Sequence, residues 1–144
     1  MDYRYKYPRM LVTVDIVVFL VGSPLKVLLI KRGNNPFKGD FALPGGYPNH
    51  NELLIDSAKR ELFEETGLNG VELTQLAAFD SINRDPRDRT LSIAYYGKTS
   101  ASNCNLVAGD DASFADWFPI TSLPKLAFDH LNIIEAALKR ILTD

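Results

Sequence analysis

Cysteine is almost absent from this chain of 144 residues, which contains a single one, Cys104. One cysteine excludes an internal disulfide framework and fits the reducing conditions of the cytoplasm, where we expect the protein. No histidine lies near Cys104 in the sequence to activate its thiol, so we interpret it as a loop residue. The only histidines, His50 and His130, are too few and too far apart to predict a zinc site.

Strong charge of one sign and long apolar runs are also missing. The net charge of −2 and the pI near 5.7 give no electrostatic reason to expect a nucleic-acid or membrane partner. The most apolar stretch, residues 11–21, is shorter than a membrane-spanning helix and contains Asp15, and the first residues lack the form of a signal peptide. The length predicts a single domain over residues 1–144.

Glycine, glutamate and arginine follow a fixed pattern between residues 46 and 68. The pattern is G-x5-E-x7-R-E-U-x-E-E-x-G-U, where U is an aliphatic residue. Its positions are filled by Gly46, Glu52, Arg60, Glu61, Leu62, Glu64, Glu65, Gly67 and Leu68. Since glycine makes up only about 7% of an average chain and the other fixed residues are similarly rare, a chance match is on the order of one in ten million.

The same segment has the signals of a helix over about residues 52–66. Asn51 is a suitable N-cap, and Gly67 stands just past the end, where a left-handed backbone is favourable only without a Cβ atom. Positions i, i+3 and i+4 of a helix share one face, which here carries Glu61, Glu64 and Glu65. The neighbouring face is apolar and contains Ile55, Ala58 and Leu62. We therefore expect the acids to border the core.

These acids predict a cation site. Like charges at this spacing destabilise a helix by about 0.2 to 0.5 kcal/mol per pair, so a cation is needed to offset them. Carboxylate oxygens suit Mg²⁺ or Mn²⁺, and Mg²⁺ completes its coordination with water and substrate phosphates. The alternative is an acidic face that is merely solvated, as charge runs usually are. The glycines, Glu52 and Arg60 at fixed spacing favour the metal site.

Strand and helix signals alternate along the chain. Apolar or alternating segments predict strands over residues 12–21, 25–31, 41–43, 75–79, 91–96 and 116–118. Asp129 is a suitable cap for a last helix, whose apolar residues repeat at helical spacing. The elements predict an α/β fold, a mixed sheet flanked by helices on both faces.

The pattern from Gly46 to Leu68 resembles the signature of the Nudix hydrolases. The resemblance implies a Nudix-like α/β/α sandwich and a metal-assisted pyrophosphatase. It implies that three acids are catalytic residues and, with the backbone of Gly46, the metal ligands: Glu61, Glu64 and Glu65. It also implies that Arg60 orients these acids and that Glu52 supports the loop before the helix, with a role as a further metal ligand left open. The turn at Gly45 lacks side chains, which lets a diphosphate approach the backbone.

Arginine is concentrated in residues 83–89, which contain Arg84, Arg87 and Arg89. A guanidinium group can hold a diphosphate through two parallel hydrogen bonds, and Asp85 and Asp88 can keep the arginines in place. The alternative is a self-neutralising surface turn built around Pro86.

This segment, together with residues 31–32, 36–37, 43–46 and 126–130, is similar to the ADP-ribose pyrophosphatase branch of the Nudix hydrolases. The similarity implies hydrolysis of ADP-ribose to AMP and ribose 5-phosphate. The residues that we expect to bind substrate are Arg32, Phe37, Gly45, Gly46, Arg84 and Arg87. Ile82 stands where the branch often has a further proline, which leaves the exact nucleotide sugar open.

The general base has two candidate positions. One of the helix glutamates is the first choice, and Asp110 or Asp111 is the second, because the segment 109–112 resembles a loop that approaches the metal site in similar enzymes. A base has to reach the attacking water directly or through one further water, which sequence alone does not fix. His130 follows the expected cap and either packs or contacts a ribose.

Three functions are consistent with these patterns. The first is an ADP-ribose pyrophosphatase with Mg²⁺, or Mn²⁺, as cofactor. The second is a Nudix hydrolase of another nucleotide, such as a damaged nucleoside triphosphate or a dinucleotide. The third is a non-catalytic ADP-ribose-sensing module, because similar domains form the ligand-binding half of transcription regulators. The complete carboxylate set favours turnover, and the chain ends directly after its last helix, so we expect no DNA-reading unit. The expected partner is a small-molecule nucleotide, and a homodimer stays open.

Overall fold

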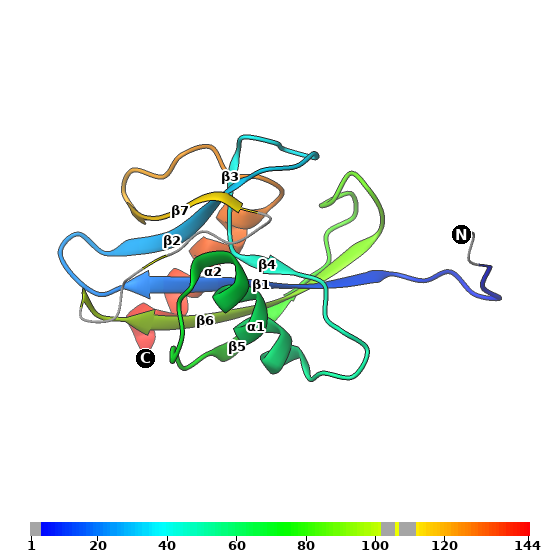
Figure 1. The fold of residues 1–144 in the computed structure, drawn as a ribbon, viewed down its shortest axis with the longest axis horizontal. Coiled ribbons are helices and arrows are strands. Elements are labelled where there is room, and N and C mark those ends of the chain that lie inside the picture. The colour runs from blue at the N-terminus through cyan, green and yellow to red at the C-terminus, as the bar shows by residue number, and fades with distance from the viewer. Residues whose placement is uncertain (1–3, 102–105, 107–111) are drawn as a thin grey trace.

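The computed structural model describes residues 4–101, 106 and 112–144, in which four strands come before one helix and three more strands before a second (Figure 1). In chain order they are β1 Leu11–Leu20, β2 Lys26–Arg32, β3 Phe41–Ala42, β4 Gly45–Gly46, α1 Leu54–Thr66, β5 Thr74–Phe79, β6 Thr90–Thr99, β7 Ala112–Pro119 and α2 His130–Thr143. Among the residues described, neither helix has the length and apolar composition that a bilayer crossing requires.

The strands form one mixed sheet. Its path is β3-β2-β1-β6-β5, while β4 pairs with β1 and β7 pairs with β2. The pairing of β1 with β6 is parallel and runs from Leu11 beside Thr90 to Leu20 beside Thr99, whereas the other pairings are antiparallel. The central strand β1 is apolar and buried on both faces, as a strand covered from both sides has to be.

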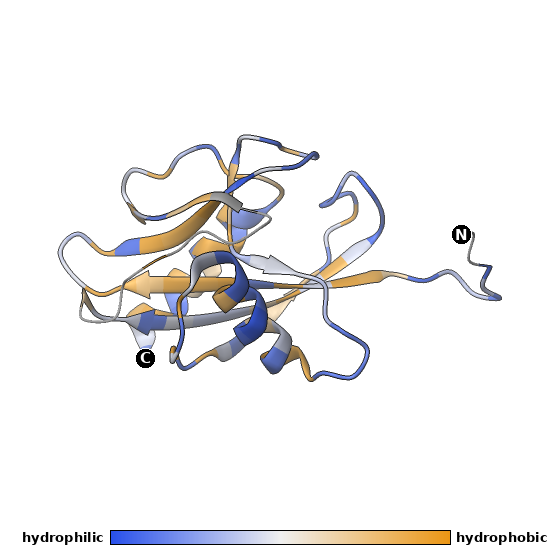
Figure 2. Ribbon diagram, viewed as in Figure 1, coloured by the Kyte–Doolittle hydropathy of each residue, from blue (hydrophilic) through white to orange (hydrophobic). Residues whose placement is uncertain are grey.

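Each face of the sheet is covered by one helix, because successive side chains of β1 point to opposite faces. Val14, Ile16 and Val18 share an apolar cluster with Ala58 and Leu62 of α1. Val17 and Phe19 of β1 point to the other face. They share the second apolar cluster with three residues of α2, namely Ile133, Ile134 and Ala137. Figure 2 shows the apolar strands between the helices and the hydrophilic outer side of α1. The predicted α/β/α sandwich is confirmed.

The start of α1 differs from the prediction. The helix begins at Leu54 and not near residue 52, and its N-cap is Leu53, which makes no side-chain cap hydrogen bond. The reason lies in Glu52, whose carboxylate accepts hydrogen bonds from the backbone N–H of Asn49 and the hydroxyl of Ser57. Glu52 thereby fixes the loop ahead of the helix, and Asn51 has no capping role.

Two strands and the cap of α2 also differ in part from the prediction. The pair Gly45–Gly46 forms β4 against β1, a strand too short for any periodic pattern to predict. Strand β7 begins at Ala112 instead of residue 116, because its whole length pairs with β2. Asp129 occupies the N-cap position of α2 as predicted, but its carboxylate makes no cap hydrogen bond.

The C-terminus of α1 ends as predicted, at a left-handed glycine. Gly67 has φ of 74° and donates its backbone N–H to the carbonyl of Phe63. An alanine in this conformation is strained, so Gly67→Ala should lower the free energy of unfolding by about 1 kcal/mol in urea titrations. Gly22→Ala is the control, since φ there is ordinary and the nearest atom to an added Cβ is 3.7 Å away. Equal losses in the two variants would contradict this account of the helix end.

Candidate active site

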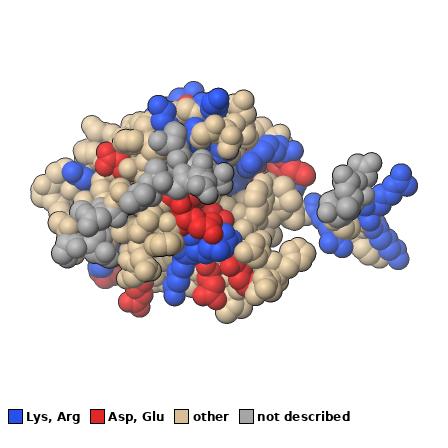
Figure 3. Space-filling model, in the orientation of Figure 1, with Lys and Arg blue, Asp and Glu red and all other residues tan. Residues whose placement is uncertain are grey.

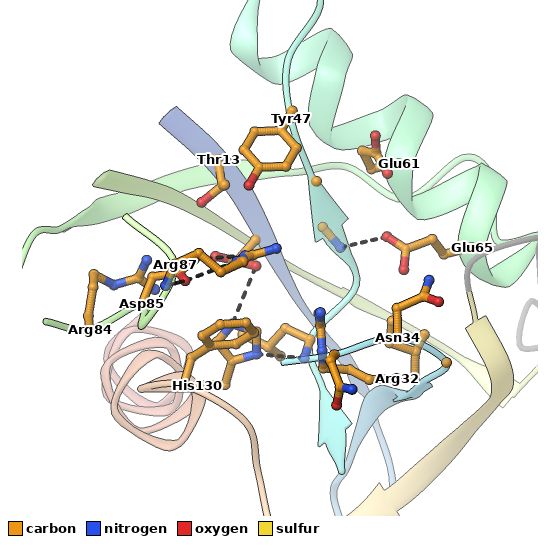
Figure 4. A pocket seen from close by; sticks show the side chains of 18 of the residues that line it. Thr13, Arg32, Asn34, Tyr47, Glu61, Glu65, Arg84, Asp85, Arg87 and His130 are labelled. Atoms are coloured by element: carbon orange, nitrogen blue, oxygen red, sulfur yellow. Dashed lines mark hydrogen bonds and ion pairs between the residues drawn. The ribbon is translucent and has the colours of Figure 1, made fainter. Parts of the chain in front are cut away.

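A cavity of about 480 Å³ opens between α1, β4 and the start of α2. Its wall includes five residues from the predicted pattern and its preceding turn: Gly45, Gly46, Arg60, Glu61 and Glu65. Three predicted arginines also line it, namely Arg32, Arg84 and Arg87. Figure 4 shows Glu61 and Glu65 on one side of the cavity and Arg84, Asp85 and Arg87 on the other. Segments far apart in the sequence therefore meet at one place.

The glycines of β4 let bare backbone lie against the acids of α1. The backbone N–H of Gly45 donates to Oε1 of Glu65 at 2.9 Å, and Glu65 is only 6% exposed. A Cβ atom on Gly45 would collide with the carbonyl of Val14 on the opposite side. A Cβ on Gly46 would come within 2.5 Å of the carboxylate carbon of Glu61. A side chain at Gly45 would therefore push the strand away from the sheet, and one at Gly46 would displace the Glu61 carboxylate.

Arg60 links the acidic side chains to one another. Its guanidinium lies 2.7 Å from Oε1 of Glu52, 2.8 Å from Oε1 of Glu61 and 3.2 Å from Oε2 of Glu64. It also donates to the backbone carbonyl of Tyr47. The eight-residue separation of Glu52 and Arg60 in the sequence does not by itself predict their ion pair, which the structure contains. Figure 3 shows acidic and basic side chains gathered next to one another over α1.

The surroundings of the acids shift their pKa values in opposite directions. Hydrogen bonds from Arg60, Ser57 and the Asn49 backbone lower the pKa of Glu52 to about 2, so this carboxylate stays ionised. Burial raises the pKa of Glu61, although Arg60 opposes the change. A further cation beside Glu61 would therefore stabilise its charged form.

The donor chemistry fits a hard divalent cation, but the acids are not arranged around one point. Within the described residues, no three side chains of His, Cys, Asp or Glu lie close enough together to form a ready-made metal site. Glu61 is paired with Arg60, and Glu64 is 56% exposed on its side chain and does not line the cavity. The carboxylates of Glu61 and Glu65 beside the β4 backbone offer the oxygen ligands that Mg²⁺ and Mn²⁺ prefer. A cation there competes with Arg60 for Glu61.

The arginine-rich segment contributes two bidentate ion pairs. Arg87 pairs with Asp85, as predicted, through contacts of 2.7 and 3.0 Å, and 40% of its side chain is exposed. Arg84 instead pairs with Asp129 at 2.6 and 2.9 Å and is only 3% exposed. This pair explains why Asp129 does not cap α2. Asp88 accepts from the backbone N–H of Arg89 and not from an arginine side chain.

Phe128 lies between the guanidinium groups of the cavity wall. Its ring centroid is 5.0 Å from the guanidinium of Arg32 and 5.5 Å from that of Arg87. Phe37, which we expected to contact substrate, packs edge-on against this ring at 4.8 Å and does not line the cavity. Phe128 has φ of 54°, an uncommon conformation for a non-glycine residue. Phe37 therefore supports Phe128 from behind.

Several lining residues were not predicted, among them Asp15, Tyr47 and Phe128. The signal for Asp15 was present, since an aspartate inside an apolar strand needs a buried partner. His130 is buried, with 4% of its surface exposed, and also lines the cavity, so contact with a ribose stays a prediction. The exposed His50 lies outside the lining. Asp110 and Asp111, the second choice for the base, and Cys104 lie outside the described residues.

Acids on one helix, a bare glycine strand and guanidinium groups across a shared cavity define a site suited to phosphate groups on an α/β/α sandwich. The model of the NUDIX domain matches residues 11–137, and the chain belongs to the Nudix family.

Two curated relatives have informative names. An ADP-ribose pyrophosphatase of Methanocaldococcus jannaschii is 47% identical over 110 residues, which are 76% of this chain. The ADPR responsive transcriptional repressor NtrR of Acinetobacter baylyi is 32% identical over 140 residues, or 94% of this chain. The chain spans 64% and 56% of the lengths of these two relatives.

Solved structures agree with the fold. The NUDIX domain of Shewanella oneidensis NrtR in complex with ADP-ribose has a TM-score of 0.87 and 34% identity, covering 97% of this chain and 94% of that one. A MutT/nudix family protein of Enterococcus faecalis also has a TM-score of 0.87, with 32% identity over 99% of this chain and 66% of that one.

The Arg84–Asp129 pair should be essential to stability. Arg84→Ala leaves the Asp129 carboxylate, whose side chain is 14% exposed, without its cation, and should lower the free energy of unfolding by about 3 kcal/mol. Lys125→Ala is the control, because Lys125 is 83% exposed and lies 3.8 Å from Asp40, a surface pair worth less than about 1 kcal/mol. Urea titrations of both variants measure the difference. A small loss for Arg84→Ala would show that the pair does not hold the loop.

Proposed function

We propose that this protein hydrolyses the diphosphate linkage of a nucleoside diphosphate derivative, with ADP-ribose as the first candidate substrate and Mg²⁺ or Mn²⁺ as cofactor. The observation that carries the proposal is the shared cavity, in which the acids of α1 and the β4 backbone face Arg32 and Arg87. The 47% identity to a protein named ADP-ribose pyrophosphatase supports the choice of substrate. The products are AMP and ribose 5-phosphate.

The reaction is attack of water on one phosphorus of the diphosphate, with departure of a monophosphate. A divalent cation bound here would neutralise charge on the phosphoryl oxygens and lower the pKa of the attacking water. Glu61 and Glu65 would hold that cation beside Gly46, and Glu64 would supply a further carboxylate from the same helix. Arg60 orients the acids through its contacts with Glu61 and Glu64.

The arginines have different roles in this proposal. Arg87 is held by Asp85 at one edge and is partly exposed, so it binds a phosphate directly. Arg32 lies over the Phe128 ring beside it and adds a second guanidinium. Arg84 is committed to Asp129 and acts by holding the loop that carries Arg87. The general base is one of the α1 glutamates, with Asp111 as the alternative.

The test of the reaction is a nucleotide panel with purified protein. With Mg²⁺ we expect ADP-ribose to be consumed and AMP and ribose 5-phosphate to appear in equal amounts, and a chelator should abolish the reaction. Chromatography with phosphorus NMR identifies the products. If ADP-ribose survives while a triphosphate or dinucleotide is cleaved, the substrate is wrong and the family chemistry is retained.

A second candidate function is ADP-ribose sensing without turnover. It is favoured by the resemblance to a repressor named as ADPR responsive and to an NrtR domain complexed with ADP ribose. The retained acids favour hydrolysis instead, since binding alone does not need them. If ADP-ribose raises the unfolding temperature but stays intact in Mg²⁺ and in Mn²⁺, sensing replaces hydrolysis.

The charge of Glu65 should matter more than its shape. In Glu65→Gln the carboxamide oxygen can still accept from the N–H of Gly45, but an anionic ligand is lost. We expect ADP-ribose hydrolysis to fall about 100-fold or more, while the metal-free free energy of unfolding changes by less than about 0.5 kcal/mol.

Glu72→Gln is the matched control, because Glu72 is an exposed glutamate outside the cavity lining. Its activity and stability should equal those of the unmodified protein. A Glu65→Gln protein that loses much stability, or that keeps its activity, would contradict a metal-binding role.

A further inference from the structure

A line of buried polar groups runs from the middle of the sheet toward the cavity. The hydroxyl of Ser92 on β6 donates to Oδ2 of Asp15 on β1. The other oxygen of Asp15 lies 3.5 Å from Nε2 of His130 at the start of α2. Nδ1 of His130 accepts a hydrogen bond of 2.9 Å from the backbone N–H of Leu43. Figure 4 shows His130 on the cavity wall with two of these contacts drawn.

The contacts assign the tautomer of His130. A backbone N–H can only donate, so Nδ1 carries the lone pair and the proton of the neutral ring is on Nε2. That N–H faces Asp15, which holds the ring in this tautomer and orientation. Burial lowers the pKa of His130, consistent with a neutral ring. The residues are 0%, 7% and 4% exposed for Ser92, Asp15 and His130, and such buried polar groups are unfavourable unless each is paired.

The line leads on to Glu65. Leu43 is followed by Pro44, whose ring fixes its own backbone and whose carbonyl accepts from the N–H of Ile16. The next residue is Gly45, whose N–H donates to Glu65. Gly45 has no room to move toward the sheet, since Val14 and Asp15 stand directly behind it. The Leu43 N–H contact therefore anchors the start of the backbone that meets Glu65, together with the pairing of β4 with β1.

We propose that His130, oriented by Asp15, is a positioning residue that fixes the Leu43–Gly46 backbone against Glu65. Its contact with Leu43 reaches the α1 acids by way of β4, so this contact acts on the hydrolysis step, whereas the ring itself lines the cavity. This role rests on the proposed hydrolysis for its kinetic consequences, while its structural consequences can be measured without any substrate. If His130 only filled space in the core, replacing it with either of two polar residues should have the same effect on activity.

Two variants separate the contacts of His130. In His130→Asn the carboxamide oxygen takes the place of Nδ1 and can accept from Leu43, whereas the contact with Asp15 is lost. In His130→Gln the longer side chain reaches Asp15 but leaves the Leu43 N–H without its acceptor. Both remove the ring, so they should lower the unfolding temperature by similar amounts.

With ADP-ribose and Mg²⁺, we expect kcat of His130→Gln to be about 10-fold below that of His130→Asn, with KM values within about twofold of each other. Equal kcat values, or a difference confined to KM, would overturn the proposal.

Amide hydrogen exchange tests the positioning role of His130 without any substrate. The Gly45 N–H should exchange faster in His130→Gln than in His130→Asn, and nitrogen NMR of the unmodified protein should show the Nε2–H tautomer. If ADP-ribose is not hydrolysed, the proposed function fails, and these measurements still decide the positioning role. Unchanged Gly45 exchange in His130→Gln, or the Nδ1–H tautomer, would overturn it.

Ser92→Ala covers the case in which the His130 variants do not fold. It removes one hydrogen bond to Asp15 and leaves the ring of His130 in place. We expect kcat to fall about 2- to 10-fold with KM unchanged, and Gly45 exchange to accelerate. An effect on neither quantity would count against the polar line as a positioning device.

Discussion

The close approach of the β4 backbone to α1 is the contact on which the cavity depends. The N–H of Gly45 meets the carboxylate of Glu65, and the backbone of Gly46 lies against Glu61. On its other side, β4 pairs with Val14 and Asp15 of β1. The strand is thus held between the sheet and the helix, where a side chain at Gly45 would strike β1 and one at Gly46 would strike the Glu61 carboxylate. The α1 carboxylates and the bare β4 backbone lie this close together only because of this fit.

Charge balance explains how the acids coexist before a cation binds. Arg60 contacts Glu52, Glu61 and Glu64 at once, so each carboxylate shares one guanidinium. Glu52 is the anchor of this group, because a pKa of about 2 keeps it ionised and paired at any ordinary pH. Glu61 is held by Arg60, while burial disfavours its charged form. A cation can therefore replace the contact between Arg60 and Glu61 without releasing Arg60 from Glu52.

Local spacing predicted what lies within one helix, and long-range pairing determined the rest. Residue spacing in the sequence is enough to place Glu61 and Glu65 on one helix face and to end the helix at Gly67. The cap expected at Asn51 failed because Glu52 has better partners in Ser57 and Arg60. Asp129 was expected to cap α2, but its partner Arg84 is 45 residues away, and no local pattern reveals such a pair.

Ion pairs between arginine and aspartate side chains also bear on how a chain with a net charge of −2 can bind a polyanion. Arg84 and Arg87 each have a carboxylate of their own, so the arginine segment adds little net charge to the surface. What remains for a ligand is directional: the exposed side of Arg87 and the guanidinium of Arg32 lie around one aromatic ring. In the proposed function, recognition then depends on the orientation of donors and not on long-range attraction, which is screened beyond about 8 Å at physiological salt. Asp129 and His130 follow Phe128 directly in the chain. Asp129 binds Arg84, and His130 binds the backbone of Leu43 next to β4. The start of α2 therefore supports both walls of the cavity.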